Sequence, residues 1–374
     1  MKFLLIAGFA ESLIVFRLGF IKALQAKGIQ VHVAAPGLSA LSSTRERLER
    51  EDVVVHDIFM DRAGINPIND IRTFLSLLVL VRRLRPDCVM AYTHKPIIYG
   101  IFASYLCRIR KRYALITGLG YGFIESDELI RKVTGFFAQT FYKIVLSKSH
   151  TIFFQNPDDR DLFYKRLLIT KKSRVLVVNG SGVDLKEFKQ ANFKKGEINF
   201  LLISRLLYDK GISEFIQAAR KVKGKYPNVK FTLAGWIDEN PNSISQNDLD
   251  AWIDEGVIDY LGRLSDVRVA IEECSVYVLP SYREGTPHSV LQAMSVGRPI
   301  ITTDVPGCKE TVLDGYNGFL VQVKSADSLE EAMLKFIEKP ELISEMGEAS
   351  RKIAVEKYDV NKVNESLLKG MLIS

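Results

Sequence analysis

Two cations occupy one short loop in the segment LLISRLLYDKGISEF, residues 201–215. Arg205 follows a buried apolar run, Lys210 precedes a helical pattern, and Gly211 allows close backbone approach. A strand-to-helix loop that presents two cations suits a diphosphate leaving group. At about 4 Å, one such contact is of order 4 kcal/mol at an effective dielectric constant of about 20, before desolvation is subtracted. The alternative interpretation is that both are surface charges flanking a turn.

A carboxylate occupies a similar position in VYVLPSYREGTPHSVLQAMSVGRPIITT, residues 276–303. Pro287 and Gly297 delimit a predicted helix over 287–296, so Glu284 stands between the end of a strand and a helix N-terminus. A carboxylate there can accept hydrogen bonds from sugar hydroxyls, and the helix dipole suits an anion such as a diphosphate. The alternative is that Glu284 only caps the helix.

Signals in the first half of the chain are weaker. Gly8 and the amides of residues 9–12 open a predicted helix, which could approach a phosphate, but GxGxxG and the P-loop lysine are missing. TGLGYGF at 117–123 lacks the acid that a dinucleotide site needs about 20 residues later. His94 ends a strand, although a lone histidine is more often structural. DDRD at 158–161 is interpreted as a solvated helix face, and no metal site is predicted.

Elements that would position these residues alternate along the whole chain. Apolar runs read as strands and periodic segments read as helices, which indicates an α/β fold with parallel sheets. Continuous apolar strands indicate that helices cover both sheet faces. The predicted strands are 2–7, 29–35, 53–59, 88–92, 113–117, 150–154, 175–178, 198–204, 229–234, 257–261, 275–280, 299–302 and 318–323. The predicted helices are 12–27, 69–85, 97–109, 127–147, 157–168, 212–224, 266–272, 287–296, 307–313 and 327–337.

The polar stretch DLKEFKQANFKKGE interrupts this alternation and predicts a domain boundary. We expect two doubly wound domains, 1–190 and 191–355, and a C-terminal helix in 356–374 that returns to the first domain. The expected ligand site is the cleft between the two sheets.

Composition excludes several classes of protein. Of the 374 residues 47% are hydrophobic and 25% are charged, which rules out a disordered or collagenous chain. The four cysteines are far apart and form no Cys/His cluster, so neither a disulfide framework nor a zinc site is predicted, and a reducing cytoplasm fits best. The first residues are interpreted as a buried strand, and every apolar stretch is shorter than the ~18–20 residues that span a bilayer.

Charge is divided unevenly along the chain. Residues 1–190 hold 29 basic and 17 acidic residues, a net charge of +12, whereas residues 191–374 carry −5. The basic residues of the first half form clusters, which indicates an anionic partner, either a membrane surface or nucleic acid. The alternative is solvated helix ends with no partner. No nucleic-acid recognition motif is found, so nucleic acid is not an expected partner.

As an ordered set, the segments resemble the retaining glycosyltransferases of family 4, which have the GT-B fold of two facing Rossmann-like domains. The resemblance covers nearly the whole chain. Within the family the sequence is most similar to bacterial transferases that add N-acetylgalactosamine to a polyprenyl-diphosphate-linked saccharide. The motifs that carry the resemblance are SRLLYDKG, GWIDENP, DYLGRLSDV, LPSYREGTPHSVLQAMSVGRPIITTDVPGCKETV and DGYNGFLV, together with VFRLGFIKAL and AYTHKP upstream.

The resemblance implies a role for each matching residue. The implied catalytic residues are His94, Arg205, Lys210 and Glu284. The implied donor-binding residues are Gly8, Ser12, Arg205, Lys210, Leu261, Arg263, Glu284, Gly285, Thr286, Pro287, His288, Ser289 and Gln292, and the acceptor-binding residues are Arg17, Lys95, Gly118 and Gly120. Gln292 departs from the family, whose members usually have a second glutamate there for the ribose; an amide can still hydrogen-bond ribose hydroxyls.

The resemblance also implies a mechanism and a location. A sugar would leave a UDP-sugar donor with retention of configuration and without a cofactor or metal ion, because protein cations neutralise the departing diphosphate. The basic first half would dock on an anionic membrane through Arg82, Arg108, Arg110, Lys111 and Arg112, peripherally and on the cytoplasmic face of the inner membrane. Two alternatives remain: a nucleotide-sugar 2-epimerase of the same fold, or a catalytically silent nucleotide-sugar-binding partner.

Overall fold

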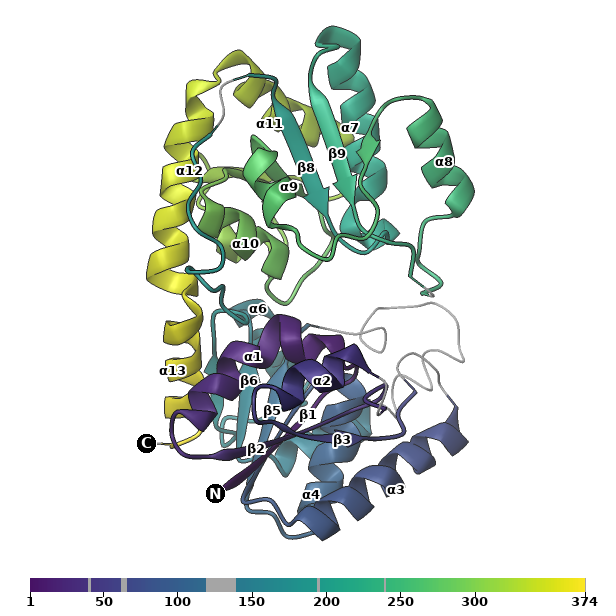
Figure 1. The fold of residues 1–374 in the computed structure, drawn as a ribbon, viewed down its shortest axis with the longest axis vertical. Coiled ribbons are helices and arrows are strands. Elements are labelled where there is room, and N and C mark those ends of the chain that lie inside the picture. Colours follow the sequence, from purple (N-terminus) through teal and green to yellow (C-terminus); the bar gives the residue numbers. More distant parts are fainter. Residues whose placement is uncertain (40–41, 62–65, 119–138, 194–195, 239, 374) are drawn as a thin grey trace. The chain divides into compact units, whose positions relative to one another are not determined.

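The computed structural model describes residues 1–374 except 40–41, 62–65, 119–138, 194–195, 239 and 374 (Figure 1). The chain forms two units. Unit 1 comprises Met1–Ser181 and Val360–Ser374, and unit 2 comprises Gly182–Asp359. Residues 182–190, expected in the first domain, thus belong to unit 2, where Phe188 is buried in the core and Val183 N donates to Tyr358 O.

Unit 1 contains a parallel sheet of order β3-β2-β1-β4-β5-β6-β7. Its strands are β1 (Lys2–Ile6), β2 (Gln30–Ala35), β3 (Val54–Asp57), β4 (Cys88–Tyr92), β5 (Lys111–Ile116), β6 (Thr151–Phe154) and β7 (Val175–Val177). The helices are α1 (Glu11–Gln25), α2 (Ser43–Glu49), α3 (Pro67–Leu84), α4 (Phe102–Leu106), α6 (Pro157–Lys165) and α13 (Val360–Gly370). Of the helix predicted over 127–147, residues 139–147 are helical and 127–138 lie outside the described residues. A π-helical turn, Pro96–Ile101, leads into α4.

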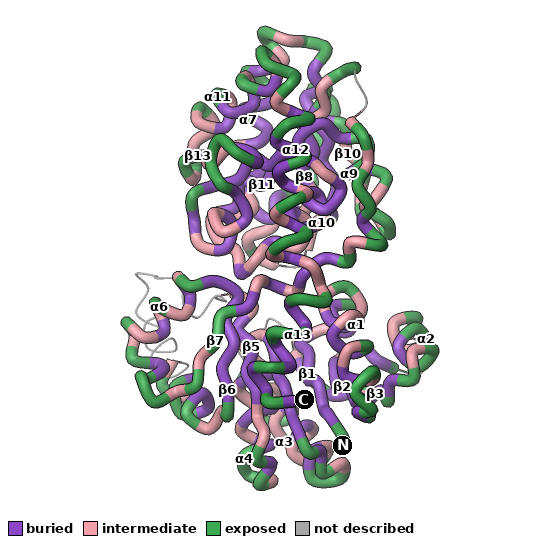
Figure 2. The backbone as a smooth tube through the Cα atoms, turned by 90° about the vertical axis from the view of Figure 1, so that its left-hand side faces the viewer, coloured by how far each residue is buried: buried purple, intermediate pink, exposed green. Residues whose placement is uncertain are grey.

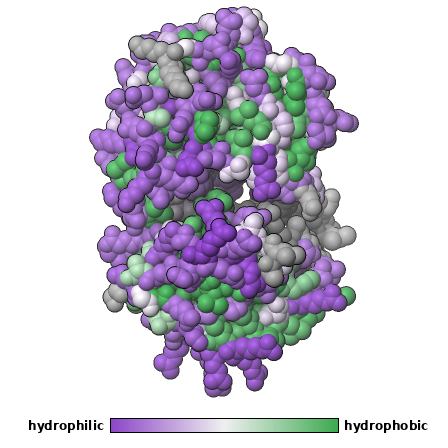
Figure 3. All heavy atoms as spheres, in the orientation of Figure 1, coloured by the Kyte–Doolittle hydropathy of each residue, from purple (hydrophilic) through white to green (hydrophobic). Residues whose placement is uncertain are grey.

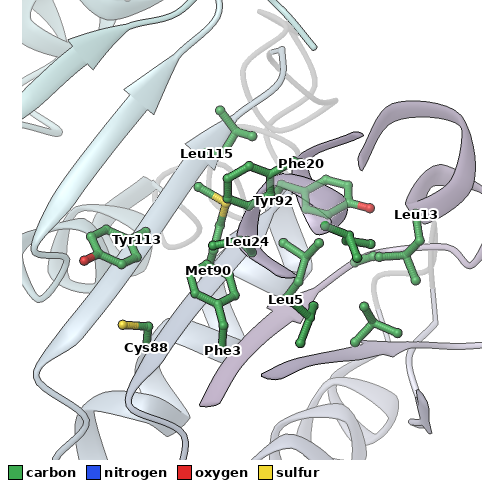
Figure 4. Close-up of a cluster of buried hydrophobic side chains, with 14 of the residues drawn as sticks. Phe3, Leu5, Leu13, Phe20, Leu24, Cys88, Met90, Tyr92, Tyr113 and Leu115 are labelled. Atoms are coloured by element: carbon green, nitrogen blue, oxygen red, sulfur yellow. The ribbon is translucent and has the colours of Figure 1, made fainter. Parts of the chain in front are cut away.

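Alternate residues of each central strand in unit 1 belong to two different cores. Phe3 and Leu5 of β1 pack beneath α1 in the cluster of Figure 4, whereas Leu4 and Ile6 face α3 and α4. The C-terminal helix α13 packs on α1, and Tyr113 Oη donates to Met371 O at 2.8 Å. This burial on both faces explains why the strands are continuous apolar runs.

Unit 2 repeats this architecture with the order β10-β9-β8-β11-β12-β13, and every pair is parallel. Its strands are β8 (Asn199–Ile203), β9 (Lys230–Ala234), β10 (Asp259–Tyr260), β11 (Val276–Leu279), β12 (Ile300–Thr303) and β13 (Gly318–Val321). The helices are α7 (Ile212–Lys225), α8 (Gln246–Asp254), α9 (Arg268–Glu273), α10 (His288–Val296), α11 (Ala326–Glu338) and α12 (Glu341–Ile353). The buried strands of both units stand out in Figure 2.

All thirteen predicted strands are present, and the prediction of two doubly wound parallel sheets is confirmed. The helix predicted over 307–313 is wrong, because only the short 3-10 turn Lys309–Thr311 forms there. Gly307 lies in the left-handed region, and its backbone touches that of Glu284, which a regular helix would not allow. Three described helices, α2, α8 and α12, were not predicted; Ser42 and Ser245 cap the N-termini of α2 and α8.

Candidate active site

The two cations and the carboxylate singled out from the sequence lie at the carboxyl ends of adjacent strands. Arg205 and Lys210 follow β8, and Glu284 follows its neighbour β11. This is the point where the strand order reverses, which is where open α/β sheets bind ligands. Lys210 Nζ forms an ion pair with Glu284 Oε1, and both side chains are largely buried. The fold thus joins two residues that sequence analysis had found in separate motifs.

Hydrogen bonds and a glycine fasten the two loops together. Gly211 has φ +71°, and a Cβ there would lie 2.1 Å from Pro280 O, so only glycine lets the loops approach this closely. Tyr282 N donates to Asp209 O at 2.8 Å, and Tyr282 Oη donates to Glu214 Oε1 at 2.7 Å. Burial, and then the neighbouring Glu214 carboxylate, raise the pKa of Tyr282, so its hydroxyl remains a donor. The ion pair is therefore held by a preformed frame.

A third loop, after β12, supports Glu284 from its other side. Glu284 N donates to Pro306 O at 3.1 Å. Gly307 has φ +86°, and a Cβ there would lie 2.1 Å from Glu284 O. Gly307 N in turn donates to Glu310 Oε2 at 2.7 Å. Neither Tyr282 nor Gly307 was singled out from the sequence, although both lie within the motif that carries Glu284.

Arg205 pairs with a residue that sequence analysis missed. Its Nη1 lies 2.7 Å from Asp238 Oδ2, and this carboxylate belongs to the loop after β9. The GWIDENP segment contained the signal, since an acid that shortly follows a buried strand falls on the same sheet edge as Arg205. Arg205 and Lys210 thus each pair with a different carboxylate.

Leu261 and Arg263 lie at the next strand end. The Arg263 guanidinium carbon is 4.5 Å from the centroid of the Trp236 ring, a cation–π contact. Leu261 N donates to Leu233 O at 2.9 Å while its side chain is exposed. These groups present a flat cationic and apolar surface.

Helix α10 begins with Pro287 at its N-cap, without a side-chain cap and without an acid in its first turn. Its first amides therefore suit an anion. Gly285 is buried, and Thr286 and His288 are half-buried around this helix start. The Ser289 hydroxyl forms a hydrogen bond with Tyr277 of β11, so Ser289 helps to hold α10 on the sheet. Gln292 lies one turn further on and is half-buried.

The corresponding strand ends of unit 1 carry His94 and Lys95 after β4. The His94 ring lies 5.6 Å from that of Tyr142, between centroids, and burial lowers the pKa of His94 to about 4. The imidazole is therefore neutral at neutral pH and can exchange hydrogen bonds with hydroxyl groups. Lys95 Nζ lies 2.8 Å from Asp70 Oδ1 in the first turn of α3. Thr93, just before His94, has φ +67°, an unusual conformation for a residue other than glycine.

Gly8, Ser12 and Arg17 lie beside this group, after β1. A Cβ on Gly8 would lie 2.8 Å from Thr93 Oγ1. The Ser12 hydroxyl bonds with Tyr92 Oη at 2.7 Å and donates to Phe9 O at 2.6 Å. The Arg17 guanidinium is buried 4.9 Å from the centroid of Tyr92, and its Nε has no hydrogen-bond partner among the described residues. Burial lowers the pKa of Arg17 to about 10, so it remains a cation at neutral pH.

The other expected residues of unit 1 differ in their surroundings. Gly118 follows β5 with φ +141°, and Gly120 lies outside the described residues. Arg82, Arg108 and Arg110 are exposed, and Lys111 is half-buried. Arg112 is engaged within the fold: its Nε donates to Lys148 O at 2.6 Å, and its guanidinium lies over the ring of Tyr105. Burial lowers the pKa of Arg112.

Among the described residues, no group of three or more His, Cys, Asp and Glu side chains could hold a metal ion. DDRD is only partly a solvated face, because Asp159 is buried and its carboxylate accepts from Asn156 Nδ2 at 3.1 Å. In the described part of the chain, no helix is both long and apolar enough to cross a membrane.

Comparison with known proteins agrees with the fold. Residues 183–353 match the family described as glycosyl transferases group 1, and residues 3–156 match the glycosyl transferase 4-like family. With these matches, the two parallel-sheet units are identified as a GT-B fold. The chain belongs to glycosyltransferase family 4 and is an enzyme of that class.

Several relatives are named for their reactions. The chain is 30% identical, over 95% of its length and 94% of the relative's, to the Campylobacter jejuni N,N'-diacetylbacillosaminyl-diphospho-undecaprenol alpha-1,3-N-acetylgalactosaminyltransferase. It is 25% identical, over 73% of its length and 72% of the relative's, to an Escherichia coli UDP-Gal:alpha-D-GlcNAc-diphosphoundecaprenol alpha-1,3-galactosyltransferase. Among solved structures, sucrose-phosphate synthase from Thermosynechococcus elongatus shares the fold with a TM-score of 0.79 and 16% identity, over 99% of this chain and 98% of that one. Anabaena HepE with UDP and glucose shares it with a TM-score of 0.74 and 17% identity, over 100% and 99%.

Proposed function

We propose that the protein transfers a hexosamine, N-acetylgalactosamine or a related sugar, from a UDP-sugar to a polyprenyl-diphosphate-linked saccharide in bacterial glycan assembly. The linkage formed is alpha and the anomeric configuration is retained. The observation that carries this proposal is the pairing of Lys210 with Glu284 at the point where the strand order of unit 2 reverses. The names of the Campylobacter and Escherichia coli relatives support the choice of donor and acceptor.

The donor diphosphate is expected to lie against Arg205, Lys210 and the N-terminus of α10. As the bond from the sugar C1 to the diphosphate oxygen breaks, negative charge grows on UDP, and preorganised cations stabilise it. The acceptor hydroxyl oxygen then forms its bond to C1, and its proton passes to a phosphate oxygen of the departing UDP. Glu284 accepts hydrogen bonds from donor-sugar hydroxyls, and no metal ion or cofactor is needed in this scheme.

Unit 1 is assigned to the acceptor. His94, neutral because of burial, lies beside the transferred sugar in this proposal, and Arg17 and Lys95 contribute positive charge toward the lipid diphosphate. Gly118 and Gly120 complete the expected acceptor contacts. Gly8 and Ser12 are expected to contact the donor, whose ribose is bound by Gln292 of unit 2. The enzyme works attached to the anionic cytoplasmic face of the inner membrane, where its lipid-linked acceptor resides.

A donor and acceptor screen tests the proposal. The purified protein is incubated with a panel of UDP-sugars and short-chain polyprenyl-diphosphate-linked saccharides, and products are identified by mass spectrometry and by the anomeric NMR coupling. We expect one α-linked sugar to be added to a lipid-linked saccharide. Epimerisation of the nucleotide sugar without an acceptor would replace the proposal with the 2-epimerase, and binding without turnover of any donor would indicate a silent binding partner.

A further inference from the structure

Helix α3 carries apolar side chains on the side that faces solvent. Its inward face packs on the sheet through Leu77 and Val81. Ile68, Ile71, Leu75 and Val79 are nonetheless 63%, 59%, 50% and 48% exposed. Their spacing of three and four residues places them along one face of the helix, which we call the α3 stripe. A surface helix normally places polar residues there, so this face is built for a partner.

Arginines flank the α3 stripe. Arg72, Arg82 and Arg83 are exposed, and by helical spacing they lie beside the stripe on the same outward half of the helix. Long arginine stems can cover apolar surface while the guanidinium reaches phosphate groups. An apolar face with arginines at its margins is typical of helices that lie in the boundary between lipid headgroups and acyl chains. Charge complementarity thus favours an anionic lipid surface over a second basic copy of this unit.

The apolar surface continues onto neighbouring elements. Tyr105 and Leu106 of α4, which packs beside α3, are 40% and 50% exposed. An open groove of about 750 Å³ runs between α3 and the edge strand β3, and Leu75, Val79 and Ile58 are among its lining residues. Figure 3 shows a hydrophobic area on this part of unit 1, where Figure 1 places α3. The stripe is therefore one part of a broader apolar surface.

The first turn of α3 is tied to the candidate acceptor site. The Asp70 carboxylate lies 2.8 Å from Lys95 Nζ, and Lys95 directly follows His94. The helix that would contact the bilayer is therefore joined directly to the loop that presents His94. This geometry suits an acceptor whose saccharide and diphosphate emerge from a lipid surface.

We propose that α3 is a membrane-docking helix that lies flat in an anionic phospholipid surface, with the α3 stripe inserted among the acyl chains and its arginines on lipid phosphates. The choice of a lipid surface rests in part on the proposed lipid-linked acceptor. The helix inserts without spanning the bilayer. Docking therefore has an apolar component that salt does not screen, beyond the electrostatic attraction of exposed basic residues.

Paired charge-insertion variants test the docking helix. We expect Leu75→Glu with Val79→Glu to lower partitioning into phosphatidylcholine vesicles containing phosphatidylglycerol at high salt by about tenfold or more, since each substitution removes an inserted apolar side chain. The matched control is Val269→Glu with Leu313→Glu, at apolar sites of unit 2 that are somewhat more exposed, at 59% and 60%. The control should bind vesicles as the unaltered protein does. Equal binding by both double variants would overturn the proposal.

A fluorescence measurement locates the stripe in the bilayer. Leu75→Trp should be quenched by brominated acyl chains when vesicles are added, whereas Val269→Trp should not be. Quenching of neither variant, or dimerisation that Leu75→Glu abolishes in the absence of lipid, would overturn the docking helix and assign the stripe elsewhere.

Transfer to a soluble short-chain acceptor separates this proposal from the proposed function. Leu75→Glu with Val79→Glu should retain that transfer while losing transfer to acceptor embedded in vesicles. If no acceptor is glycosylated by any variant but stripe-dependent vesicle binding persists, the proposed function fails and the docking helix stands. Loss of soluble transfer in the double variant would instead count against a role confined to docking.

Discussion

The two units place functional candidates at equivalent points of equivalent sheets, yet these side chains are held in different ways. In unit 2 the loops after β8 and β11 carry Lys210, Arg205 and Glu284, and each cation is paired with a carboxylate. In unit 1 the loop after β4 carries His94, and helix α1, which follows β1, carries Arg17; both side chains are held by burial and aromatic contacts. The same strand order thus supports two cation–carboxylate pairs at one site and a buried neutral histidine at the other.

The difference matches the ligands proposed for each unit. A donor diphosphate can replace Glu284 and Asp238 as the partner of the cations, so the charges in unit 2 are exchanged rather than newly buried. A sugar hydroxyl is neutral, and a histidine that stays neutral can bond to it without a counter-charge. The fold fixes where the site forms, and the local dielectric environment determines which chemistry it favours.

Removing the Lys210 charge is expected to give the largest effect. Lys210→Ala should lower turnover by roughly 100-fold or more, and affect the KM for donor less, because the cation acts mainly on charge that develops during the reaction. Steady-state kinetics with the UDP-sugar measures both. Lys230→Ala is the matched control, since Lys230 forms an exposed pair with Glu197 on the same unit. Near-normal turnover of Lys210→Ala would show that the charge of Lys210 does not act in catalysis.

Rigidity of the unit 2 frame is tested by two glycines with the same backbone conformation. Gly211 and Gly256 have φ +71° and +69°, but a Cβ meets Pro280 O only at Gly211, and nothing within 4 Å at Gly256. Gly256→Ala should cost about 1 kcal/mol of unfolding free energy from the left-handed conformation alone. Gly211→Ala should cost at least about 2 kcal/mol more, because backbone must move, and should also lower turnover. Urea unfolding and kinetics measure these effects; equal costs would show that the close approach is unimportant.

The neutral state of His94 in unit 1 is tested through pH. Because burial lowers the pKa of His94 to about 4, the unfolded chain takes up its proton below about 6.5 while the folded chain does not. This contribution to stability is fully present above pH 6.5 and is lost as pH falls toward 4. In the His94→Gln variant the unfolding free energy should therefore decrease less between about pH 7 and pH 5 than in the unaltered protein, by on the order of 1 kcal/mol.

Two spectroscopic signals show which unit loses stability as the pH falls. Both tryptophans, Trp236 and Trp252, lie in unit 2, so their fluorescence reports on that unit, whereas far-UV circular dichroism reports on both. His94→Gln should change the pH dependence of the circular dichroism transition more than that of the fluorescence transition. An unchanged pH profile in both signals would mean that His94 titrates normally in the folded protein.

Gln292→Glu is expected to give the smallest effect. The change should alter the KM for UDP-sugar by a few fold while turnover stays within a few fold, since the ribose lies away from the bond that breaks. Gln246→Glu, at the exposed start of α8, is a control for adding one negative charge to the same unit. Collapse of turnover in Gln292→Glu alone would show that this position acts on the reacting sugar.

Sequence alone located most of the fold and the main elements of the donor site. Apolar runs that are continuous, and not alternating with polar residues, predicted buried parallel strands. Every predicted strand formed. Because carboxyl ends of parallel strands meet at one edge, Arg205, Lys210 and Glu284 could be expected there. The helix over 307–313 failed because periodicity does not detect a backbone contact such as that of Gly307 with Glu284.

Only the tertiary structure decided which charged side chains pair and which helix faces are buried. Asp238, and not Glu284, pairs with Arg205 because the loop after β9 brings it within 2.7 Å, a distance that depends on the pairing of β9 with β8. The burial that keeps His94 neutral likewise comes from packing around its ring. In α3 both faces are apolar, so the sequence could not tell the inward Leu77 from the outward Leu75. Periodicity records which side chains share a helix face, whereas the sheet determines which of those faces is covered.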